Sequence, residues 1–474
     1  MIIPQQLQDS IRGEDLIQLM RHGHVHFMGI GGSGMCALAE LFVRDGGEVS
    51  GCDISSGAIK EHFRSMNVTV HDGHECKHLE EVDALVISAA VPLDHSEIQE
   101  AHSRGIPVLK RSEALGMWVN RGEVLAIAGT HGKTSTTAMA TEILAEAGLN
   151  PTGIVGGRVS GWDSNMRYGS DLYVVEADEY DRSFLNLEPK VAVVTNLEAD
   201  HLDTYGNIES VIKAFCDFLG ALSKEGRGII CGDDYGASKL LGILNGRGYT
   251  YGTSAGSQLR GVDIKTKPGS IEFRIVEDGF DKGIFSLSVP GVHNLRNALG
   301  AAAAARYFEV SWEDIRRSLM LYKGVGRRFE IVGLENDILL VDDYAHHPSE
   351  ISATLEAARD SYPDRRIVAI FQPHLFSRTQ DFADDFGRAL AGADVIWVTS
   401  IFPAREEPIP GVTGALISTA AEREGGNVKY HSDLDTIADV VASDLMPGDL
   451  LVTMGAGSIE YVPGLVLNIL KECG

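Results

Sequence analysis

The chain has few cysteines. Six occur in 474 residues, and no two of them form a CxxC pair. So sparse a set does not build the disulfide frameworks of small secreted domains. We therefore expect reduced thiols that are mostly packed in the interior. The six are Cys36, Cys52, Cys76, Cys216, Cys231 and Cys473.

Long apolar segments are also missing. No run of residues is long enough to cross a bilayer. The first residues, Met1-Ile-Ile-Pro-Gln-Gln-Leu-Gln, lack the charged region followed by an apolar stretch that marks a secretory signal. The sequence thus predicts a cytoplasmic protein without a membrane partner.

Positive charge is scarce. The chain has 41 basic and 67 acidic residues, which gives a formal net charge of -26. This excess of negative charge opposes general binding to nucleic acid or to an anionic membrane surface. A local basic pocket for an anionic metabolite is compatible with it.

Repeats, low-complexity tracts and long linkers are absent, and short apolar strands alternate with helical patterns instead. This alternation is typical of parallel α/β units. The length and the 44% of hydrophobic residues predict about three domains. We place them at 1–120, 121–323 and 324–474. Alternation at 270–276 and 284–289 predicts one small antiparallel hairpin.

A glycine-rich turn, Gly129-Thr-His-Gly-Lys-Thr-Ser-Thr136, lies between an expected strand at 124–128 and an expected helix at 137–147. Amide groups at such a helix start face phosphates, Lys133 adds positive charge, and the Thr134 hydroxyl can ligate Mg²⁺. The longer Walker spacing would require glycine at position 127, where this chain has Ile127. The alternative is a turn with a surface lysine, but the order of strand, loop, Lys-Thr and helix favours a nucleotide triphosphate.

A second glycine-rich turn, Gly29-Ile-Gly-Gly-Ser-Gly34, fits G-x-G-x-x-G between a strand and a helix, and Asp53 ends the next expected strand. Glycines allow the backbone to approach a diphosphate, whether it belongs to a dinucleotide or to a sugar nucleotide. A tight turn without a ligand is the structural alternative. The candidate ligand-binding residues are Gly31, Gly32, Ser33, Gly34 and Asp53.

Carboxylates and an imidazole follow two further strands of the second block. Glu176-Ala-Asp-Glu179 ends one strand, and Asn196-Leu-Glu-Ala-Asp-His-Leu-Asp203 follows another. Both groups are expected at the carboxyl edge of one parallel sheet, where ligands of such folds bind. Oxygen ligands suit Mg²⁺, and His201 can serve as an additional ligand. A solvated acidic surface is the alternative explanation.

Further polar groups come later in the chain. Asn294 and Asn297 are three residues apart on an expected helix, so they share a face and can bind an adenine edge, although asparagine at a helix start is often a cap. In the third block, candidate residues crowd at strand ends, where such folds keep their sites. They are Arg327, Asp343, Tyr344, His346, His347, His374 and Arg378.

Together these motifs resemble the Mur ligase family, which lengthens the peptide of the bacterial cell-wall precursor. The resemblance covers nearly the whole chain. It is carried by the residues 29–35, 129–134, 176–179, 196–205, 293–297, 326–330, 342–348, 372–374 and 403–406.

The resemblance implies a Rossmann-like domain for a UDP-sugar, a central ATPase domain, and a C-terminal Rossmann-like domain for an amino acid. It implies joining of L-alanine to the lactyl carboxylate of UDP-N-acetylmuramate through an acyl phosphate, with ATP and Mg²⁺. Lys133, Glu176 and His201 would be catalytic, and Thr134, Glu176 and His201 would hold metal. The expected ATP-binding residues are Gly129, Thr130, His131, Gly132, Lys133, Thr134, Ser135, His293, Asn294, Asn297, Arg327 and Asp343. Tyr344, His346, His374 and Arg378 would border the sugar carboxylate and alanine.

One feature departs from the family. Other Mur ligases carry a carbamylated lysine shortly after the DHxD segment, and the corresponding stretch here reads Ala214-Phe-Cys-Asp217. We therefore assign no such lysine, and we expect His201 to have a larger part in holding a second metal ion.

Three other functions compete. A folate-directed or peptide-recycling relative is one, although folate has no diphosphate for the loop at 29–34. A nicotinamide oxidoreductase leaves the lysine loop unexplained, and a P-loop switch protein leaves the other two blocks unexplained. The sequence does not show how strictly alanine is preferred over glycine or serine, and it does not show the oligomeric state.

Overall fold

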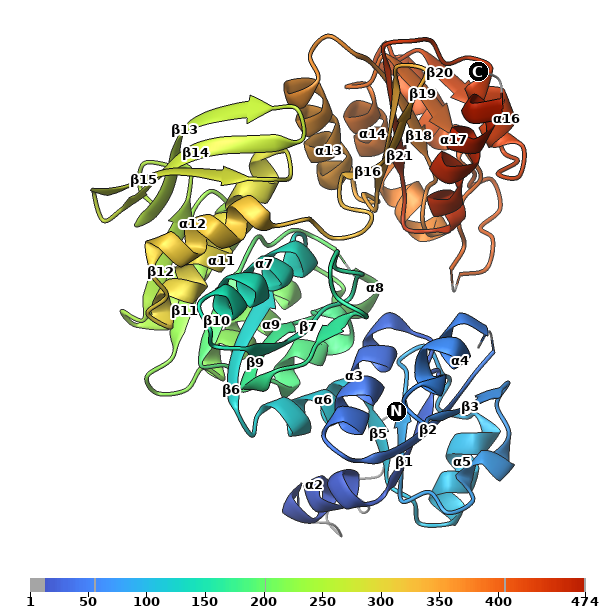
Figure 1. Ribbon diagram of the computed structural model, residues 1–474. Coiled ribbons are helices and arrows are strands. Elements are labelled where there is room, and N and C mark those ends of the chain that lie inside the picture. Colours follow the sequence, from blue (N-terminus) through green and yellow to red (C-terminus); the bar gives the residue numbers. More distant parts are fainter. Residues whose placement is uncertain (1–12, 55–56, 201, 405, 473–474) are drawn as a thin grey trace. The chain divides into compact units, whose positions relative to one another are not determined.

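The computed structural model describes residues 13–54, 57–200, 202–404 and 406–472 (Figure 1). The chain forms two compact units. One comprises the described residues up to 260 with 277–280 and 297–318, and the other comprises 261–276, 281–296 and the described residues from 319 onward. Each unit is described by itself.

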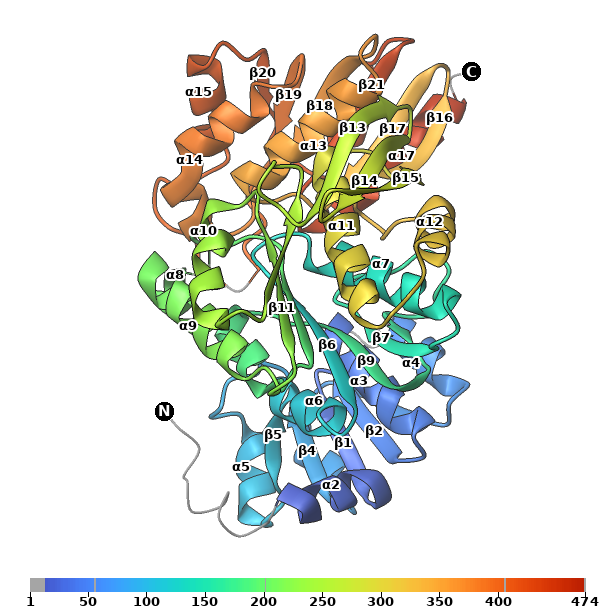
Figure 2. The ribbon, with the colours of Figure 1, turned by 90° about the vertical axis from the view of Figure 1, so that its left-hand side faces the viewer.

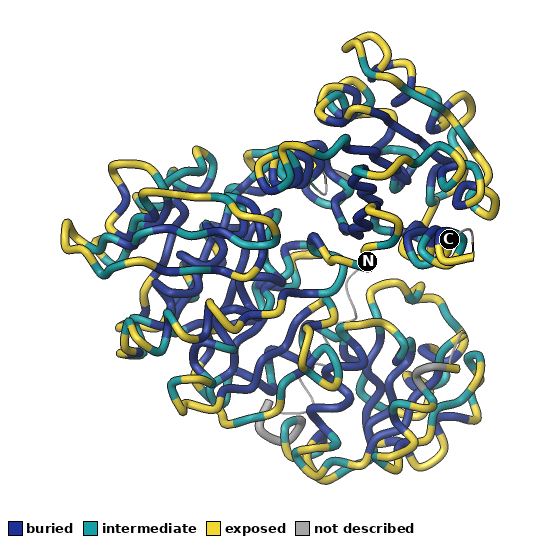
Figure 3. Tube along the Cα trace, turned by 45° about the horizontal axis from the view of Figure 1, so that its top comes forward, coloured by how far each residue is buried: buried dark blue, intermediate teal, exposed yellow. Residues whose placement is uncertain are grey.

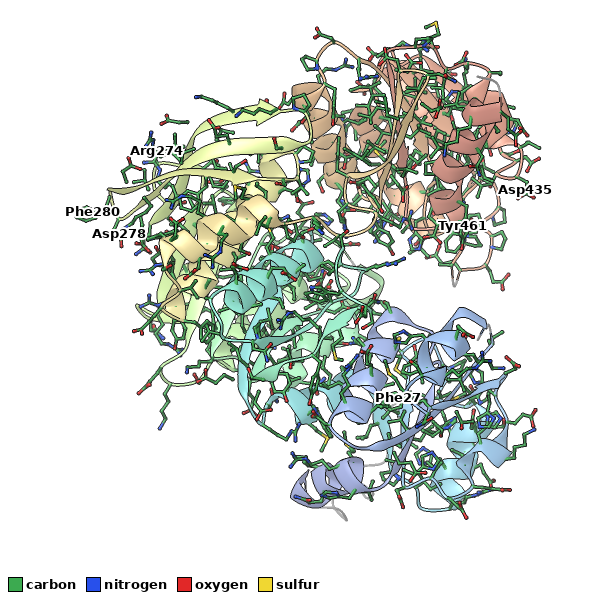
Figure 4. The ribbon with its side chains drawn as sticks, viewed as in Figure 1. Phe27, Arg274, Asp278, Phe280, Asp435 and Tyr461 are labelled. Carbon is green, nitrogen blue, oxygen red and sulfur yellow. The ribbon has the colours of Figure 1, made fainter. Side chains whose placement is uncertain are left out.

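The first sheet is entirely parallel and has the order β3-β2-β1-β4-β5. Val25 and Phe27 of β1 are fully buried on the face that packs against α3, and Figure 4 labels Phe27. The opposite face packs against η1 and α5. The elements are α2 (Gly13–His22), β1 (His24–Met28), α3 (Ser33–Arg44), β2 (Glu48–Asp53), α4 (Gly57–Arg64), β3 (Thr69–Asp72), η1 (Cys76–Leu79), β4 (Ala84–Ile87), α5 (Ser96–Ser103), β5 (Val108–Lys110) and α6 (Arg111–Val119).

The second sheet has ten strands in the order β15-β14-β13-β12-β11-β10-β6-β9-β7-β8. Strand β6 lies between β10 and β9 and is parallel to both. Figure 2 shows β6 and β9 side by side. Its elements up to β12 are β6 (Glu123–Ala128), α7 (Lys133–Glu146), β7 (Pro151–Ile154), β8 (Met166–Arg167), β9 (Ser170–Glu176), η2 (Tyr180–Asn186), β10 (Val191–Val194), α8 (Leu202–Tyr205), α9 (Ile208–Gly220), β11 (Arg227–Cys231), α10 (Tyr235–Ser238), η3 (Lys239–Leu244) and β12 (Gly248–Gly252).

The expected hairpin is present, but its second strand begins earlier than the sequence pattern indicated. Strands β14 (Ser270–Glu277) and β15 (Phe280–Leu287) are neighbours, whereas the second strand was expected at 284–289. The cause is the turn, because Asp278 and Gly279 both have positive φ, 49° and 84°, as a two-residue hairpin turn requires. Figure 4 labels Asp278 and Phe280 at this turn. The flanking elements are β13 (Leu259–Lys267), α11 (Val292–Tyr307) and α12 (Trp312–Leu321).

The third sheet has the order β16-β17-β21-β18-β19-β20, with only β16 antiparallel to its neighbour. Helices α13 to α15 pack on one face and α16 and α17 on the other (Figure 1). The elements are β16 (Glu330–Glu335), β17 (Ile338–Asp343), α13 (Pro348–Ser361), β18 (Arg366–Phe371), α14 (Phe376–Leu390), β19 (Val395–Val398), α15 (Ala415–Arg423), β20 (Val428–Tyr430), α16 (Ile437–Ala442), β21 (Asp449–Met454), η4 (Ser458–Tyr461) and α17 (Val462–Glu472).

Central strands of the three sheets, such as β4, β10 and β18, are buried, whereas the edge strands β3, β16 and β20 are partly exposed. Figure 3 shows the alternation of buried and exposed stretches along the trace. This confirms the expected α/β class with mostly parallel sheets and a small antiparallel portion, which includes the pairs β7–β8 and β16–β17 besides the hairpin. The domain boundaries proposed from the sequence stay predictions. Within the described ranges, no helix combines the length and the apolar character needed to span a membrane.

Candidate active site

The phosphate loop connects the central strand β6 to helix α7. The helix begins at Lys133 rather than near Thr137, so Lys133 and Thr134 belong to its first turn. Gly129 and Gly132 have φ of 135° and 82°, and Gly132 precedes the helix as its N-cap. A Cβ at Gly129 would lie 2.0 Å from Oγ1 of Thr195, so only glycine fits there. The backbone N–H groups at the start of this helix suit an anion.

The end of strand β10 holds this loop in shape. The Asn196 side chain accepts a hydrogen bond from the backbone N–H of His131 at 2.7 Å and donates one to the His131 carbonyl at 3.0 Å. Thr195 Oγ1 donates to the same carbonyl at 2.6 Å. The backbone N–H of Glu198 donates to Oγ1 of Thr130 at 2.9 Å. The loop is therefore ordered by side chains of a neighbouring strand before any ligand binds.

Lys133 is the central cation of the loop. Its Nζ donates to the carbonyls of Gly129 and Thr130 at 2.7 and 3.2 Å, and it forms an ion pair with Glu179 at 2.8 and 2.9 Å. Burial alone would lower the pKa of Lys133, but the negative charges of Glu179 and its acidic neighbours outweigh burial and raise that pKa above its usual value. Lys133 is thus charged at neutral pH and lies directly over the loop.

Thr134 and Glu176 form an oxygen-rich pair beside the lysine. Glu176 is the last residue of β9, and both of its carboxylate oxygens lie 3.0 Å from Oγ1 of Thr134. The N–H of Gly156 donates to the same carboxylate at 2.7 Å, which fixes its position. A hydroxyl beside a carboxylate is a donor set that suits Mg²⁺. The structure therefore brings together two of the three predicted metal ligands, while the third, His201, lies outside the described residues.

The other expected ATP-binding residues of this unit surround the same loop. Ser135 is in the first turn of α7 and is buried. Asn297 of α11 lies against Gly132, where an added Cβ would come within 2.5 Å of its Oδ1. In the second unit, Asn294 donates to the carbonyl of Pro290 at 2.8 Å, and burial lowers the pKa of His293 to about 4.

The glycine-rich turn at 29–34, the first of the two along the chain, joins β1 to α3. Gly29 has φ of 82°, and the N–H of Gly31 donates to Oδ2 of Asp53 at 2.8 Å. Asp53 therefore orders the turn itself, in addition to its predicted role in ligand binding. The guanidinium of Arg111 packs against Gly34, since a Cβ there would lie 3.2 Å from Nη1. This places a positive charge beside the start of α3, where Gly32 is the N-cap and Ser33 the first residue.

Arg327 and Asp343 both have protein partners in the second unit. The Arg327 guanidinium bonds to Asp342 at 2.9 Å and to the carbonyl of Gly455 at 2.6 Å. Asp343 accepts from the backbone N–H groups of Phe329 and Ala345 at 2.7 and 2.8 Å, and burial raises its pKa to about 6. These contacts fix the loop before β16 to the end of β17. The predicted roles of both residues in ATP binding stay predictions.

Three of the remaining candidates of the third block form a cluster of aromatic rings. His346 packs edge-on against Tyr344 and His374, with ring centroids 5.3 and 5.7 Å apart. Burial lowers the pKa of His346 to about 4, and the nearby positive charge of Arg378 on α14 contributes. Ring nitrogen Nδ1 of His347 lies 2.8 Å from Oγ of Ser349 at the start of α13, apart from this cluster of rings. The sequence thus located four of the residues that the structure brings together here.

Three further residues of these sites were not among the sequence candidates. Glu179 is the ion-pair partner of Lys133, Asn196 shapes the phosphate loop, and Arg111 packs beside the first turn. Glu179 and Asn196 lie within two of the predicted motifs, and their position just after β9 and β10 is the signal that could have identified them. Arg111 follows a short strand without a functional motif, so only the tertiary structure shows that it lies beside Gly34.

Comparison with known proteins places the chain in a family of enzymes. The Mur ligase family, catalytic domain, matches residues 24–122; the Mur ligase middle domain matches 127–305; and the Mur ligase, glutamate ligase domain, matches 327–457. The chain belongs to the Mur ligase family.

The chain is also similar to individual enzymes over nearly its whole length. The UDP-N-acetylmuramate--L-alanine ligase of Solibacter usitatus is 42% identical over 457 residues, which cover 96% of this chain and 97% of the relative. The enzyme of the same name from Salinibacter ruber is 40% identical over 459 residues, with 96% and 97% covered. The crystal structure of UDP-N-acetylmuramate-alanine ligase from Thermotoga maritima is similar with a TM-score of 0.82 at 26% identity, and the match covers 96% of this chain and 100% of that one.

Proposed function

We propose that this protein is an ATP-dependent ligase that joins L-alanine to the lactyl carboxylate of UDP-N-acetylmuramate in peptidoglycan precursor synthesis. The two relatives named above are UDP-N-acetylmuramate--L-alanine ligases and match nearly the whole chain. The structural observation that carries the proposal is the charged Lys133 at the start of α7, directly over a glycine turn shaped for phosphate. The cytoplasmic location expected from the sequence stays a prediction.

Amide formation from a carboxylate requires a leaving group better than oxide. In the proposed reaction, the lactyl carboxylate attacks the γ-phosphorus of ATP, the bond to the bridging oxygen of ADP breaks, and an acyl phosphate forms. The amine of alanine then attacks the acyl carbon, loses a proton and displaces inorganic phosphate. Because the phosphoryl group itself activates the acid, no side-chain nucleophile is required.

Lys133 stabilises the first step. Negative charge spreads over the transferring phosphoryl oxygens, and a positioned cation in a site with little water offsets it. The carbonyls of Gly129 and Thr130 hold Nζ in place, so the lysine needs little reorganisation when the reaction proceeds. Its ion pair with Glu179 keeps the ammonium charged, and binding of ATP exchanges part of this pairing for phosphate oxygens.

Thr134 and Glu176 fit a Mg²⁺ ion. Their hydroxyl and carboxylate oxygens converge at 3.0 Å, and Gly156 orients the carboxylate. A bound Mg²⁺ would supply neutralisation of the charge on the ATP phosphates. His201 is the proposed ligand of a second ion.

The other two sites would bind the reactants. The turn at 29–34, with Arg111 beside it, suits the diphosphate of the UDP-sugar, because both its amides and the guanidinium favour an anion. The cluster of Tyr344, His346, His374 and Arg378 supplies rings and a cation for the substrate carboxylate and alanine.

The test is phosphate release in the presence of ATP, Mg²⁺, UDP-N-acetylmuramate and each of the twenty amino acids in turn. We expect release that depends on both the sugar nucleotide and L-alanine, with ADP as the second product. Omission of the sugar nucleotide is the control, and NADH in place of ATP tests the oxidoreductase alternative. Absence of ATP cleavage with the sugar and any amino acid would overturn the proposal.

A further inference from the structure

Four side chains that commonly ligate metals meet in the interior of the first sheet, on the face covered by η1 and α5. His26 comes from β1, Cys52 from β2, His78 from η1 and Glu97 from α5 (the elements are labelled in Figure 1). The side chains of His26 and Glu97 are 0% exposed, and that of His78 is 2% exposed. Neither the proposed ligase chemistry nor the glycine turn uses them.

The donor atoms have the spacing of a small coordination shell. Nε2 of His26 lies 3.3 Å from Sγ of Cys52 and 3.7 Å from Oε1 of Glu97. Oε1 of Glu97 lies 3.4 Å from Nδ1 of His78 and 3.8 Å from Sγ of Cys52. All four donors lie within 4.8 Å of one another. Zinc bonds of about 2.0–2.3 Å place tetrahedral ligands roughly 3.3–3.8 Å apart, which these separations match.

Charge also favours a cation at this point. Glu97 is a buried carboxylate, and among the residues that the structure describes its ion-pair partners are His26, His74 and His78, with no lysine or arginine. A buried acidic group without a full positive charge beside it is costly. A divalent ion held by one carboxylate, one thiolate and two neutral imidazoles gives a centre without net charge, which a dry core accommodates.

We propose that His26, Cys52, His78 and Glu97 form a closed binding site for Zn²⁺ in the first sheet. Nitrogen and sulfur donors select zinc over Mg²⁺, which prefers oxygen ligands. Four protein ligands leave no open position, so the site is structural and does not activate water.

The surroundings of the four ligands support this assignment. Nδ1 of His26 lies 2.7 Å from Oγ of Ser50, a contact that orients the ring so that Nε2 faces the cluster. His74 is a neighbour at the rim, with Nδ1 3.0 Å from Sγ of Cys52. The N–H of Glu75 donates to Nδ1 of His78 at a long 3.4 Å, and ligation would replace this bond.

The site is joined to the first glycine turn through the backbone. The carbonyl of Cys52 accepts from the N–H groups of Gly29 and Ile30 at 2.8 and 3.2 Å, and Asp53 holds Gly31. Zinc would therefore steady the turn that the proposed function assigns to the sugar nucleotide. This consequence rests on the proposed function, whereas zinc binding itself does not.

Zinc titration of the full-length protein tests the site. The protein is freed of metal with a chelator and titrated with Zn²⁺ against a chromogenic competitor, with Mg²⁺ in large excess to occupy oxygen-rich sites. We expect one equivalent of tightly bound zinc per chain. Cys52→Ala and Glu97→Gln should each weaken binding by about a hundredfold or more, since even loss of an outer partner costs about 10–100-fold. Cys36→Ala is the matched control, because Cys36 is buried in the same domain against the other face.

A cobalt titration gives a second, spectroscopic readout of the same site. Co²⁺ at this site should give a thiolate-to-metal charge-transfer band in the parent and in Cys36→Ala, but not in Cys52→Ala. Substoichiometric zinc in the parent, absence of the cobalt band, or equal zinc affinity in the parent and both ligand variants would overturn the proposal. Loss of ligase activity with intact zinc binding would instead count only against the proposed function.

Discussion

Replacement of Lys133 by alanine tests the central element of the proposed chemistry. The side chain of the lysine is only 12% exposed, and its charge lies over the turn that would hold the transferring phosphate. Removal of one positioned electrostatic group from a reaction of this kind costs about a hundredfold or more in turnover. Since each tenfold change is 1.36 kcal/mol, this corresponds to at least about 2.7 kcal/mol of lost transition-state stabilisation.

The same change has a separate effect on stability. Lys133→Ala leaves Glu179, with its side chain 4% exposed, as a buried carboxylate without its cation. Breaking such a pair costs about 3–5 kcal/mol of the free energy of unfolding. The double variant Lys133→Ala/Glu179→Gln should recover much of this stability but none of the turnover, because the uncompensated charge is gone while the catalytic cation is still missing.

The assay is ADP release at saturating ATP, UDP-N-acetylmuramate and L-alanine, with denaturant unfolding measured on the same samples. Lys190→Ala serves as the matched control, because Lys190 lies in the same unit and pairs with Glu123 at the surface. Its turnover should equal that of the parent. If Lys133→Ala is folded and turns over within tenfold of the parent, the assignment of Lys133 is wrong. Restored turnover in the double variant would contradict it equally.

Three further predictions follow from local geometry. Gly129→Ala should abolish ATP binding, measured by calorimetry, because the added Cβ would lie 2.0 Å from Thr195 Oγ1. Gly148→Ala is the control and should bind ATP normally, because Gly148 also has positive φ but lies in open space. Thr134→Val should raise the Mg²⁺ concentration needed for half-maximal ADP release, because it removes a hydroxyl ligand while preserving shape; an unchanged requirement argues against that role. His346 has a pKa of about 4 in the folded protein against 6.5 in the unfolded chain, so the unfolded chain binds a proton first as the pH falls. The free energy of unfolding should therefore decrease between pH 6.5 and pH 4, by at most about 3 kcal/mol. In His346→Gln, the free energy of unfolding should decrease correspondingly less over this range.

The sequence was informative wherever a pattern reflects local backbone requirements. Buried strands such as β6 and β18 are continuous apolar runs, and glycines at positive φ mark the turns that follow β1 and β6. Side chains at strand ends, such as Glu176, could be assigned to one edge of the sheet because parallel strands end together. The element types and most of the candidate residues were therefore predictable.

Contacts between distant segments were not predictable in the same way. Glu179 and Lys133 are separated by 46 positions, and nothing in either segment specifies their pairing. Arg111 reaches Gly34 only because α6 packs against α3, a matter of tertiary arrangement. The sparse cysteines gave no metal motif, since His26, Cys52, His78 and Glu97 come from four separate elements whose spacing in the chain has no regular period.

Side chains of Thr195, Asn196 and Lys133 bind main-chain atoms of the phosphate turn, and the crowding at Gly129 excludes every larger residue. A designed inhibitor that bonds to these peptide groups would contact atoms that a point substitution cannot remove without destroying the turn itself. Resistance through this part of the protein would then have to arise elsewhere, at residues whose side chains only border the nucleotide.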